Sequence, residues 1–298
     1  MAPFKSSLAK SASKLFGLSN QSDLSLRGAT QSIREEVLPF EASGGTKIPT
    51  SDAGNGYTYH VFLYGTSDNF VVNSGSKDVE VLIVAGGGGG AWSYYSGGGG
   101  GGGCVSGTTN CTEGTYPITV GDKGLDSPPG SPNTAGQHAT NGGNSAFNSV
   151  TALGGGGGFG GSGGYPGSAS GGSGGGAHGY PADASASIVK APQPVPGDFT
   201  AYGNNGGLGT PYAGGGGGGG LYYTIGPDPA ANGKPAGGTG GGADGAGSEP
   251  SGVQPWNIGP ARKAVMHTGG GGGGGNYGAN SFGTDGATGI VLVRYQPD

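Results

Sequence analysis

Charged residues are scarce in this chain, at 10% of its 298 residues. The formal net charge is −5, and no segment gathers Lys and Arg into a basic stripe. Proteins that hold nucleic acid through its phosphates normally carry such a stripe. We therefore expect no nucleic-acid partner.

Long hydrophobic runs are also missing. The longest strongly apolar stretch has about eight residues, whereas roughly 20 are needed to cross a bilayer. Residues 1–20 contain lysines but neither the continuous apolar region nor the cleavage pattern of a signal peptide. We expect no membrane insertion and synthesis in a cytoplasm. A hydrophobic content of 32% also argues against a compact enzyme with a conventional core.

Cysteine is limited to Cys104 and Cys111. Two ligands are too few for a structural zinc site within one chain. The two residues bracket Val-Ser-Gly-Thr-Thr-Asn, which is compatible with a turn. The sequence leaves two alternatives for these residues, a disulfide that closes this small loop and a pair of free thiols.

Motifs for catalysis, cofactors or metals are lacking. The four histidines are scattered without ligand spacing: His60, His138, His178 and His267. G-x-G-x-x-G matches arise here from composition alone, and Gly233-Lys234 is followed by Pro235 rather than by Ser or Thr. We expect no enzyme activity, no catalytic residue, no cofactor and no metal.

Glycine is abundant instead, with 78 Gly and 20 Pro against averages of about 7% and 5%. Many glycines stand in solid runs: 86–90, 97–103, 154–158, 214–220 and 269–275. Collagen is excluded, because it needs Gly at every third position. Two alternatives are a flexible coil and a bundle of polyproline-II helices whose backbones bond to one another. Ordering glycine costs much backbone entropy, so a bundle would need dense hydrogen bonding and a rigid frame.

The frame is predicted from β-branched and alternating runs, which are typical of strands. They are residues 57–63, 69–72, 79–84, 116–120, 144–147, 150–153 and 289–295. The predicted fold class is mostly β plus irregular structure. A small antiparallel β-sandwich or jelly-roll-like framework, closed by the strands at 79–84 and 289–295, would support the polyproline-II bundle.

One local pattern fits that bundle. Phe159, Ser162, Tyr165 and Ser168 recur at every third position, and the residues between them are Gly except for Pro166. A polyproline-II helix has three residues per turn, so these side chains would share one edge. In so glycine-rich a chain, coincidence is the alternative.

The N-terminal residues have a different pattern. Apolar side chains recur at helical spacing: Phe4, Leu8, Ala12 and Leu15. Such a helix is too short to stand alone, so it predicts a docking segment that folds on a partner, and a disordered tail is the alternative. The predicted division is 1–36 for docking and 37–298 for the framework with its glycine-rich part at about 79–295.

Aromatic residues in loops between the glycine runs are the remaining functional signal. They are Trp92, Tyr94, Tyr95, Tyr222, Tyr223 and Trp256. Aromatic side chains on loops suit recognition of sugars or protein surfaces, because they offer a large rigid contact area. Alternatively, they cover the sides of the bundle.

Several segments in order resemble the glycine-rich domain of tailed-phage tail-fibre and virion proteins. They are Val79–Gly88, Tyr116–Gly121, Asn141–Ser145, Thr151–Gly155 and the closing Gly289–Tyr295. The resemblance implies a virion structural protein, in the form of a fibre or receptor-binding appendage. It does not fix the position on the particle, and we expect the tail or its fibres rather than the head. Its loops would bind a host surface glycan or protein.

The same resemblance implies a homo-oligomer, with a trimer usual for fibres, and attachment to other virion proteins through residues 1–36. A capsid decoration or tail-structural protein without a receptor role is the alternative. A secreted or phase-separating low-complexity protein is a third class, and the predicted strands argue against it.

Overall fold

The structure is a computed structural model that describes residues 38–66, 68–92, 96–127, 138–160, 170–176, 192–203, 264–275 and 283–298. The chain divides into two units, Met1–Leu38 and Pro39–Asp298. The predicted docking residues Phe4, Leu8 and Leu15 lie outside the described residues. The strands and contacts described are those of the second unit.

The described part of this unit is mostly β, with antiparallel sheets and almost no helix, as the sequence predicted. Its elements are β1 (Glu41–Ser43), β2 (Thr46–Ile48), α2 (Thr50–Ala53), β3 (Thr58–Leu63), β4 (Phe70–Val84), β5 (Cys104–Tyr116), β6 (Ile118–Thr119), β7 (Ser145–Phe147), β8 (Val150–Ala152), β9 (Phe199–Tyr202) and β10 (Ile290–Tyr295).

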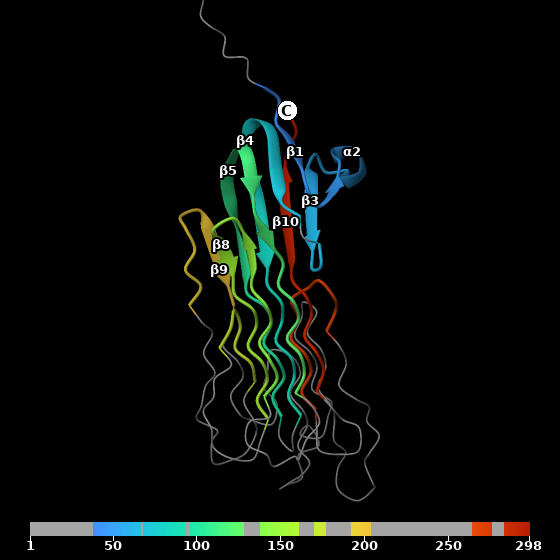
Figure 1. Cartoon of the computed structure of the whole chain (residues 1–298), viewed down its shortest axis with the longest axis vertical. Helices are drawn as coiled ribbons and strands as arrows, with labels where there is room; N and C mark the ends of the chain where they lie inside the picture. Colours follow the sequence, from blue (N-terminus) through green and yellow to red (C-terminus); the bar gives the residue numbers. More distant parts are fainter. Residues whose placement is uncertain are drawn as a thin grey trace, which may run out of the picture. The chain divides into compact units, whose positions relative to one another are not determined.

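The larger sheet of the described residues has the order β2-β3-β10-β4-β5-β9, and β1 pairs with β4 beside it (Figure 1). β10 lies between β3 and β4, with Val291 opposite both Phe62 and Ile83. The strands predicted at 79–84 and 289–295 therefore pair directly with each other, as neighbours in the middle of this sheet.

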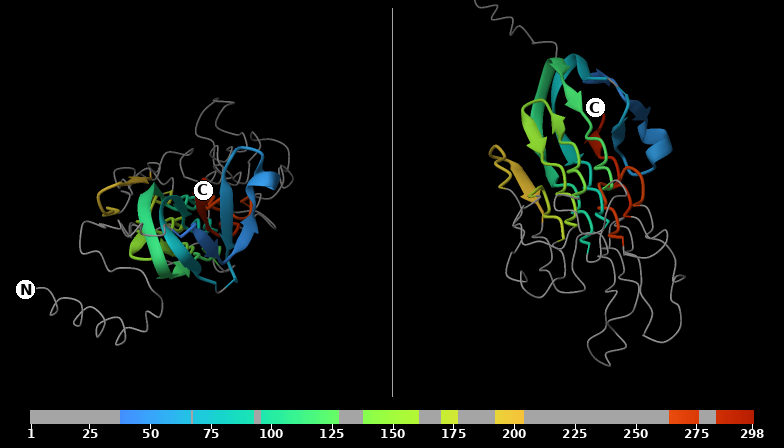
Figure 2. Two further views of the ribbon diagram at one scale, coloured as in Figure 1. Left: turned by 90° about the horizontal axis from the view of Figure 1, so that it is seen from above. Right: turned by 60° about the horizontal axis from the view of Figure 1, so that its bottom comes forward.

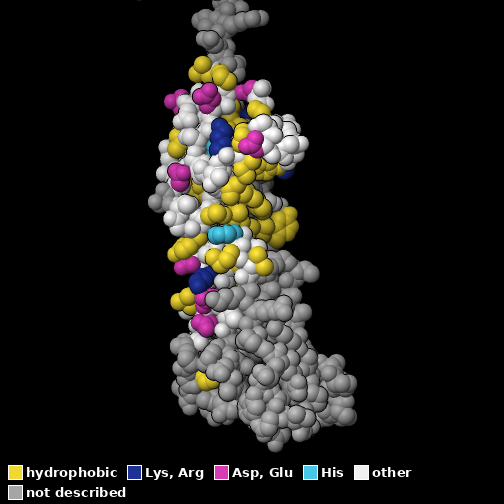
Figure 3. All heavy atoms as spheres, turned by 90° about the vertical axis from the view of Figure 1, so that its right-hand side faces the viewer, with side chains coloured by type: hydrophobic (Ala, Val, Ile, Leu, Met, Phe, Trp, Pro, Cys, Tyr) yellow, Lys and Arg dark blue, Asp and Glu magenta, His cyan; other side chains and the backbone are white. Residues whose placement is uncertain are grey.

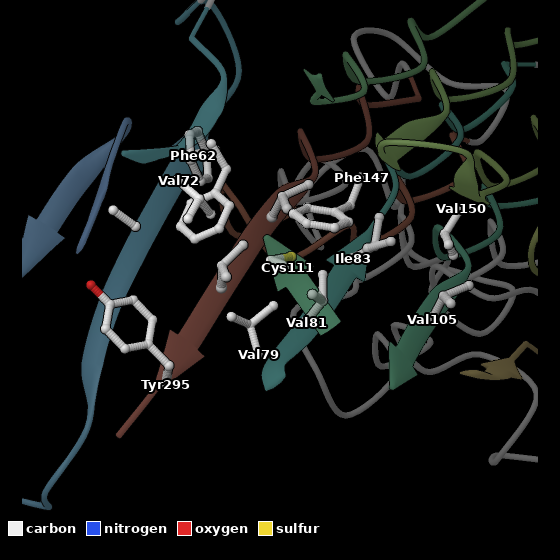
Figure 4. Close-up of a cluster of buried hydrophobic side chains, with 14 of the residues drawn as sticks. Phe62, Val72, Val79, Val81, Ile83, Val105, Cys111, Phe147, Val150 and Tyr295 are labelled. Carbon is white, nitrogen blue, oxygen red and sulfur yellow. The ribbon is translucent and has the colours of Figure 1, made fainter. Parts of the chain in front are cut away.

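Alternation along these strands creates the core. On β3, β10 and the second half of β4, every second residue is buried, and the others are partly exposed. The three-stranded sheet β6-β7-β8 packs on the buried side. There the centre of the Phe147 ring lies 6.2 Å from that of Phe70 and 5.8 Å from that of Tyr116. One hydrophobic cluster thus joins both sheets (Figure 4).

The predictions for two strands were wrong in extent. Residues 69–72 and 79–84 were expected to be separate strands, but β4 is one strand of 15 residues. The register against β5 shifts between Val72 and Ser76, where Gly75 has a φ of 75°. A bulge of this kind lets a strand continue through a stretch whose composition resembles a turn.

β5 was not predicted at all, because the segment between the cysteines was interpreted as a turn. Cys104 and Cys111 stand on one continuous strand and are both free thiols. They stand seven positions apart, which is roughly 23 Å along a strand, and this odd spacing places them on opposite faces. A disulfide needs Cα atoms within about 7 Å, so this strand is incompatible with one between them.

His60 is a polar group within the core. It is fully buried, its Nδ1–H donates to the Gly44 carbonyl at 2.7 Å, and its Nε2 lies 3.4 Å from the Tyr295 hydroxyl. Burial lowers the pKa of His60, and this outweighs the opposite effect of the Gly44 bond. Burial also lowers the pKa of His138.

We expect the protein to lose stability as the pH falls below about 6.5. Below that pH the unfolded chain binds more protons than the folded chain, because the histidine pKa values are lowered in the folded chain. Each linked proton contributes at most about 1.4 kcal/mol per pH unit. Urea unfolding at pH 7.5 and pH 5.5 measures this, and His60→Gln should flatten the dependence. An unchanged slope in that variant would contradict the assignment.

Eight glycine-rich segments of the described residues run side by side away from the sheets (Figures 1 and 2). They are residues 85–91, 96–103, 121–125, 138–144, 153–160, 171–176, 269–275 and 283–289, and we call them the glycine bundle. Most of their residues are buried. Since few of them have large side chains, the interior of the glycine bundle is built from peptide groups.

Residues 85–91 form the centre of the glycine bundle. The N–H groups of Ala85, Gly88 and Ala91 bond to the carbonyls of Gly103, Gly100 and Gly97. The N–H groups one and two positions further on bond in the same three-residue period to residues 138–144 and 283–289. Carbonyls of the central segment accept bonds from residues 121–125, 153–160 and 269–275. The segment therefore has six neighbours and a hydrogen-bond period of three.

Close approach of the backbones explains why these positions are glycine. A Cβ built on Gly88 would lie 2.1 Å from the carbonyl oxygen of Gly156, and one on Gly90 would lie 2.0 Å from that of Gly273. The same holds for Gly86, Gly87 and Gly89, each against backbone atoms. No side chain fits at any of these five positions without displacing a neighbouring segment.

One serine joins the sheets to the glycine bundle. Ser145, on β7, is fully buried. Its hydroxyl accepts the N–H of Gly121 and donates to the carbonyl of Val84, both at 2.8 Å. It thus links the points at which two segments of the glycine bundle leave the strands.

Candidate recognition surface

The ends of the glycine bundle farthest from the sheets are fastened by serine side chains. Ser127 is fully buried, and its Oγ accepts the N–H of Trp92 at 2.7 Å. Ser96 is almost fully buried and donates its hydroxyl to the carbonyl of Gly275. Gly275 in turn donates its N–H to Ala91 at 2.8 Å. Four segments are therefore held in register at this end.

Trp92 is the one predicted recognition residue that the structure describes. It follows directly on the central segment and is partly exposed. The other five, Tyr94, Tyr95, Tyr222, Tyr223 and Trp256, lie outside the described residues. The two interpretations of these aromatic residues, recognition and cover for the bundle, therefore both stay predictions.

A second aromatic contact lies at the same end. The rings of His138 and Phe159 are 3.9 Å apart, and the two residues form a β-bridge. The Phe159 carbonyl also accepts the N–H of Gly97, and the Phe159 N–H donates to the carbonyl of Gly176. Phe159 is buried. The prediction that it shares one edge with the residues at every third position after it stays a prediction. Ser162, Tyr165 and Ser168 lie outside the described residues.

Charged side chains join two segments on one flank of the glycine bundle. We call this group, Lys123, Asp126 and Asp285, the clasp. Lys123 pairs with Asp285, which also accepts the N–H of Asp126 at 3.0 Å. Burial and the nearby Asp285 raise the pKa of Asp126, while Asp285 raises the pKa of Lys123. The clasp joins residues 121–127 to residues 283–289. Its charges are used in structural pairing, which leaves it little capacity to bind a ligand.

A groove of about 350 Å³ lies between the two sheets. Its lining combines aromatic rings, amides, hydroxyls and one carboxylate: Tyr116, Phe147, Phe199, Asn110, Asn148, Thr108, Ser149 and Asp198, among others. The Asn110 side chain is already engaged with Ser76 and Asp78. Thr108, Asn148, Ser149 and Asp198 are exposed.

Within the described ranges, no group of three or more His, Cys, Asp or Glu side chains could hold a metal ion. No helix in that part of the chain has the length and apolar character needed to cross a membrane.

Sequence reasoning missed the residues that fasten the glycine bundle. Ser96 and Ser127 look like ordinary members of Gly/Ser-rich loops, and Ser145 like a polar residue in a short strand. The available signal was position, because each stands at a boundary between a glycine-rich segment and another element. A hydroxyl there can bond to a backbone group that the bundle leaves unpaired.

The comparisons with known proteins agree with this architecture. A family model described as a glycine-rich domain matches residues 63–296, which cover β4 to β10 and the whole glycine bundle. Among curated proteins, no match to the chain was found.

Proposed function

Because this chain belongs to the glycine-rich domain family, we propose that it is a structural protein of a phage virion, most readily a tail fibre or receptor-binding appendage. In this proposal the β framework carries a rigid bundle of polyproline-II helices. Loops at the far end of that bundle attach to the host cell. The phage context comes from the sequence resemblance. The hydrogen bonds within the glycine bundle and at its far end support the attachment role.

The polyproline-II assignment is supported by the period of the hydrogen bonds. A polyproline-II helix has three residues per turn and no internal hydrogen bonds, so its peptide groups face outward in three directions. The N–H groups of successive residues in 85–91 donate hydrogen bonds in turn to three different neighbouring segments. Their carbonyls accept hydrogen bonds from the three remaining neighbouring segments.

The observation that carries the attachment role is the fastening of the segment ends. Trp92, Ser96, Ser127 and Gly275 are fixed to one another at the end away from the sheets. Residues 93–95, which include Tyr94 and Tyr95, connect two of these fixed points. Holding a loop by rigid ends lowers the entropy cost of binding, which is what a recognition loop requires.

Electron microscopy of intact particles with gold-labelled antibody to residues 180–260 tests the location. Label on the tail or its fibres is the expected result. Label spread over the head would identify a decoration protein, the alternative without receptor binding. If purified protein binds the antibody but no particle is labelled, the virion proposal is wrong.

Competition with infection tests the attachment role. Purified full-length protein should adsorb to host cells and reduce phage adsorption. A variant with Trp92, Tyr94 and Tyr95 replaced by alanine should compete at least about 10-fold less well, since aromatic anchors commonly dominate binding. Tyr64→Ala, an exposed aromatic residue next to the sheet, is the matched control and should compete normally. Equal competition by all three proteins would exclude these loop residues as receptor contacts.

A further inference from the structure

The outward face of the large sheet is unusually apolar. Strand registers align its residues in rows across β3, β10, β4 and β5. The row nearest the glycine bundle is Leu63, Ile290, Val84 and Cys104, and the next is Val61, Leu292, Leu82 and Ser106. All of these side chains are partly exposed. We call this surface the outer face.

The outer face continues into neighbouring exposed side chains. Val265 and Met266 are 61% and 55% exposed. The turn of Val265 and Met266 is held to this region by His267, whose Nδ1 lies 3.0 Å from the Thr288 hydroxyl. Figure 3 views the molecule from the side on which β3 and α2 lie, at the edge of this sheet, and shows hydrophobic side chains in its middle. The two apolar rows of the outer face are contiguous across four strands, and contiguous apolar surface marks interaction sites.

Charge on the outer face is internally neutralised. The third row carries one acid and one base, Glu80 and Arg294, and they pair with each other through the Arg294 Nε at 3.1 Å and its Nη2. The Arg294 guanidinium also lies 4.5 Å from the centre of the Tyr57 ring. The surface therefore selects neither an acidic nor a basic partner. A second identical face would meet it without like-charge repulsion.

The outer face also has complementary relief. Large side chains on β3 and β10, including Tyr59 and Arg294, form a ridge on one side of a hollow of about 470 Å³. We call it the Tyr59 ridge. Small residues of β5, Ser106 to Thr108, stand on the other side of the hollow, with Leu82 between them. The Tyr59 ridge is fixed, because the Tyr59 hydroxyl accepts a hydrogen bond from the Asn55 amide at 2.7 Å.

We propose that the outer face binds a second copy of this chain in a two-fold arrangement, in which the Tyr59 ridge of each copy enters the hollow of the other. A two-fold contact requires one patch to carry both complementary features, which this face does. This inference does not depend on the virion function proposed above.

The size of the outer face sets the expected strength. Four strands about 4.8 Å apart and six residues long make a face of roughly 400 Å² per copy. Two copies then bury about 800 Å² in total, which is at the low end for protein interfaces and typical of weak or transient contacts. We therefore expect reversible association in the micromolar range rather than an obligate dimer.

Sedimentation velocity of the full chain from about 1 to 200 µM tests the association. The unaltered protein should shift from monomer to dimer across this range. Leu292→Glu and, separately, Ser106→Arg should weaken association at least about 10-fold, by opposing like charges and by filling the hollow. Ser149→Glu, on an exposed turn of the other sheet, makes the same charge change and should dimerise normally. Thermal unfolding of each variant checks folding.

Two outcomes would overturn the proposal. The first is an unaltered protein that stays monomeric up to 200 µM. The second is a dimer that persists in both Leu292→Glu and Ser106→Arg, since the contact would then lie elsewhere. If Leu292→Glu fails to fold, Ser106→Arg decides the result alone.

Cysteine pairing tests the arrangement itself. Chains carrying Tyr59→Cys and chains carrying Thr108→Cys, both with Cys104→Ser, are mixed and oxidised. Cys111 is buried, and burial raises its pKa to about 11, so it should not compete. We expect a cross-linked dimer mainly in the mixture. Equal yields from either chain alone would exclude the ridge-in-hollow geometry.

Discussion

Gly88→Ala should destabilise the protein by at least about 3 kcal/mol or prevent its folding. The new methyl group would lie 2.1 Å from the Gly156 oxygen and 2.5 Å from its carbonyl carbon. The residue cannot shift aside, because its N–H bonds to Gly100 and its carbonyl accepts the N–H of Gly272. Overpacking ordinarily costs about 1–3 kcal/mol, and here the obstructing atoms are backbone. Urea unfolding and amide exchange measure the loss.

Gly101→Ala provides the matched control within the same bundle. Its Cβ would meet nothing closer than the Gly269 oxygen at 3.7 Å, which is ordinary contact. Removing a glycine from the unfolded chain should then leave stability unchanged or raise it by up to about 1 kcal/mol. Similar losses from Gly88→Ala and Gly101→Ala would show that close backbone packing is not what selects glycine here.

Ser145→Ala should cost about 2–4 kcal/mol. The substitution removes no packing volume of note, but it leaves the Gly121 N–H and the Val84 carbonyl without this partner in a fully buried place. Each buried polar group that loses its partner costs about 1–3 kcal/mol. Chemical unfolding monitored by circular dichroism gives the value.

Ser149→Ala, four residues along the chain and exposed, is the reference for Ser145→Ala and should change stability by less than about 0.5 kcal/mol. Amide exchange adds a more specific readout. Ser145→Ala should accelerate exchange at Gly121 and its neighbours in the glycine bundle before it affects β10. Uniform acceleration throughout the domain would instead indicate a general loss of packing.

The β framework was largely predictable where side chains encode it. β3, the second half of β4 and β10 alternate β-branched and aromatic residues with a buried face, and these strands were identified from that pattern. β5 carries mostly Thr, Gly and Asn, so nothing in its sequence separates it from a loop. Its strand character comes from its long pairing with β4, a tertiary effect. β9 is short and at the sheet edge, and its residues were not among the predicted strands.

The arrangement of the glycine bundle could not be predicted in the same way. Glycine has no side chain, so the sequence of Gly86–Gly90 contains nothing that distinguishes residues 96–103 from residues 269–275 as a neighbour. Register comes from the strands from which the segments leave and from a few hydroxyls such as those of Ser96 and Ser127. The candidate recognition residues were chosen because they are aromatic and stand between glycine runs, and among them the structure describes Trp92 alone.

The position of the C-terminal residues has a consequence for how this chain folds. Gly87 donates its N–H to Ala287, two hundred positions later, at 2.8 Å, and β10 fills the gap between β3 and β4. At about 5–20 residues per second, a ribosome needs roughly 10–40 seconds to make the intervening chain. The central segment cannot form its hydrogen bonds to the C-terminal residues until that time has passed. Folding should therefore be slow and complete only after synthesis, as expected for structures dominated by contacts distant in sequence.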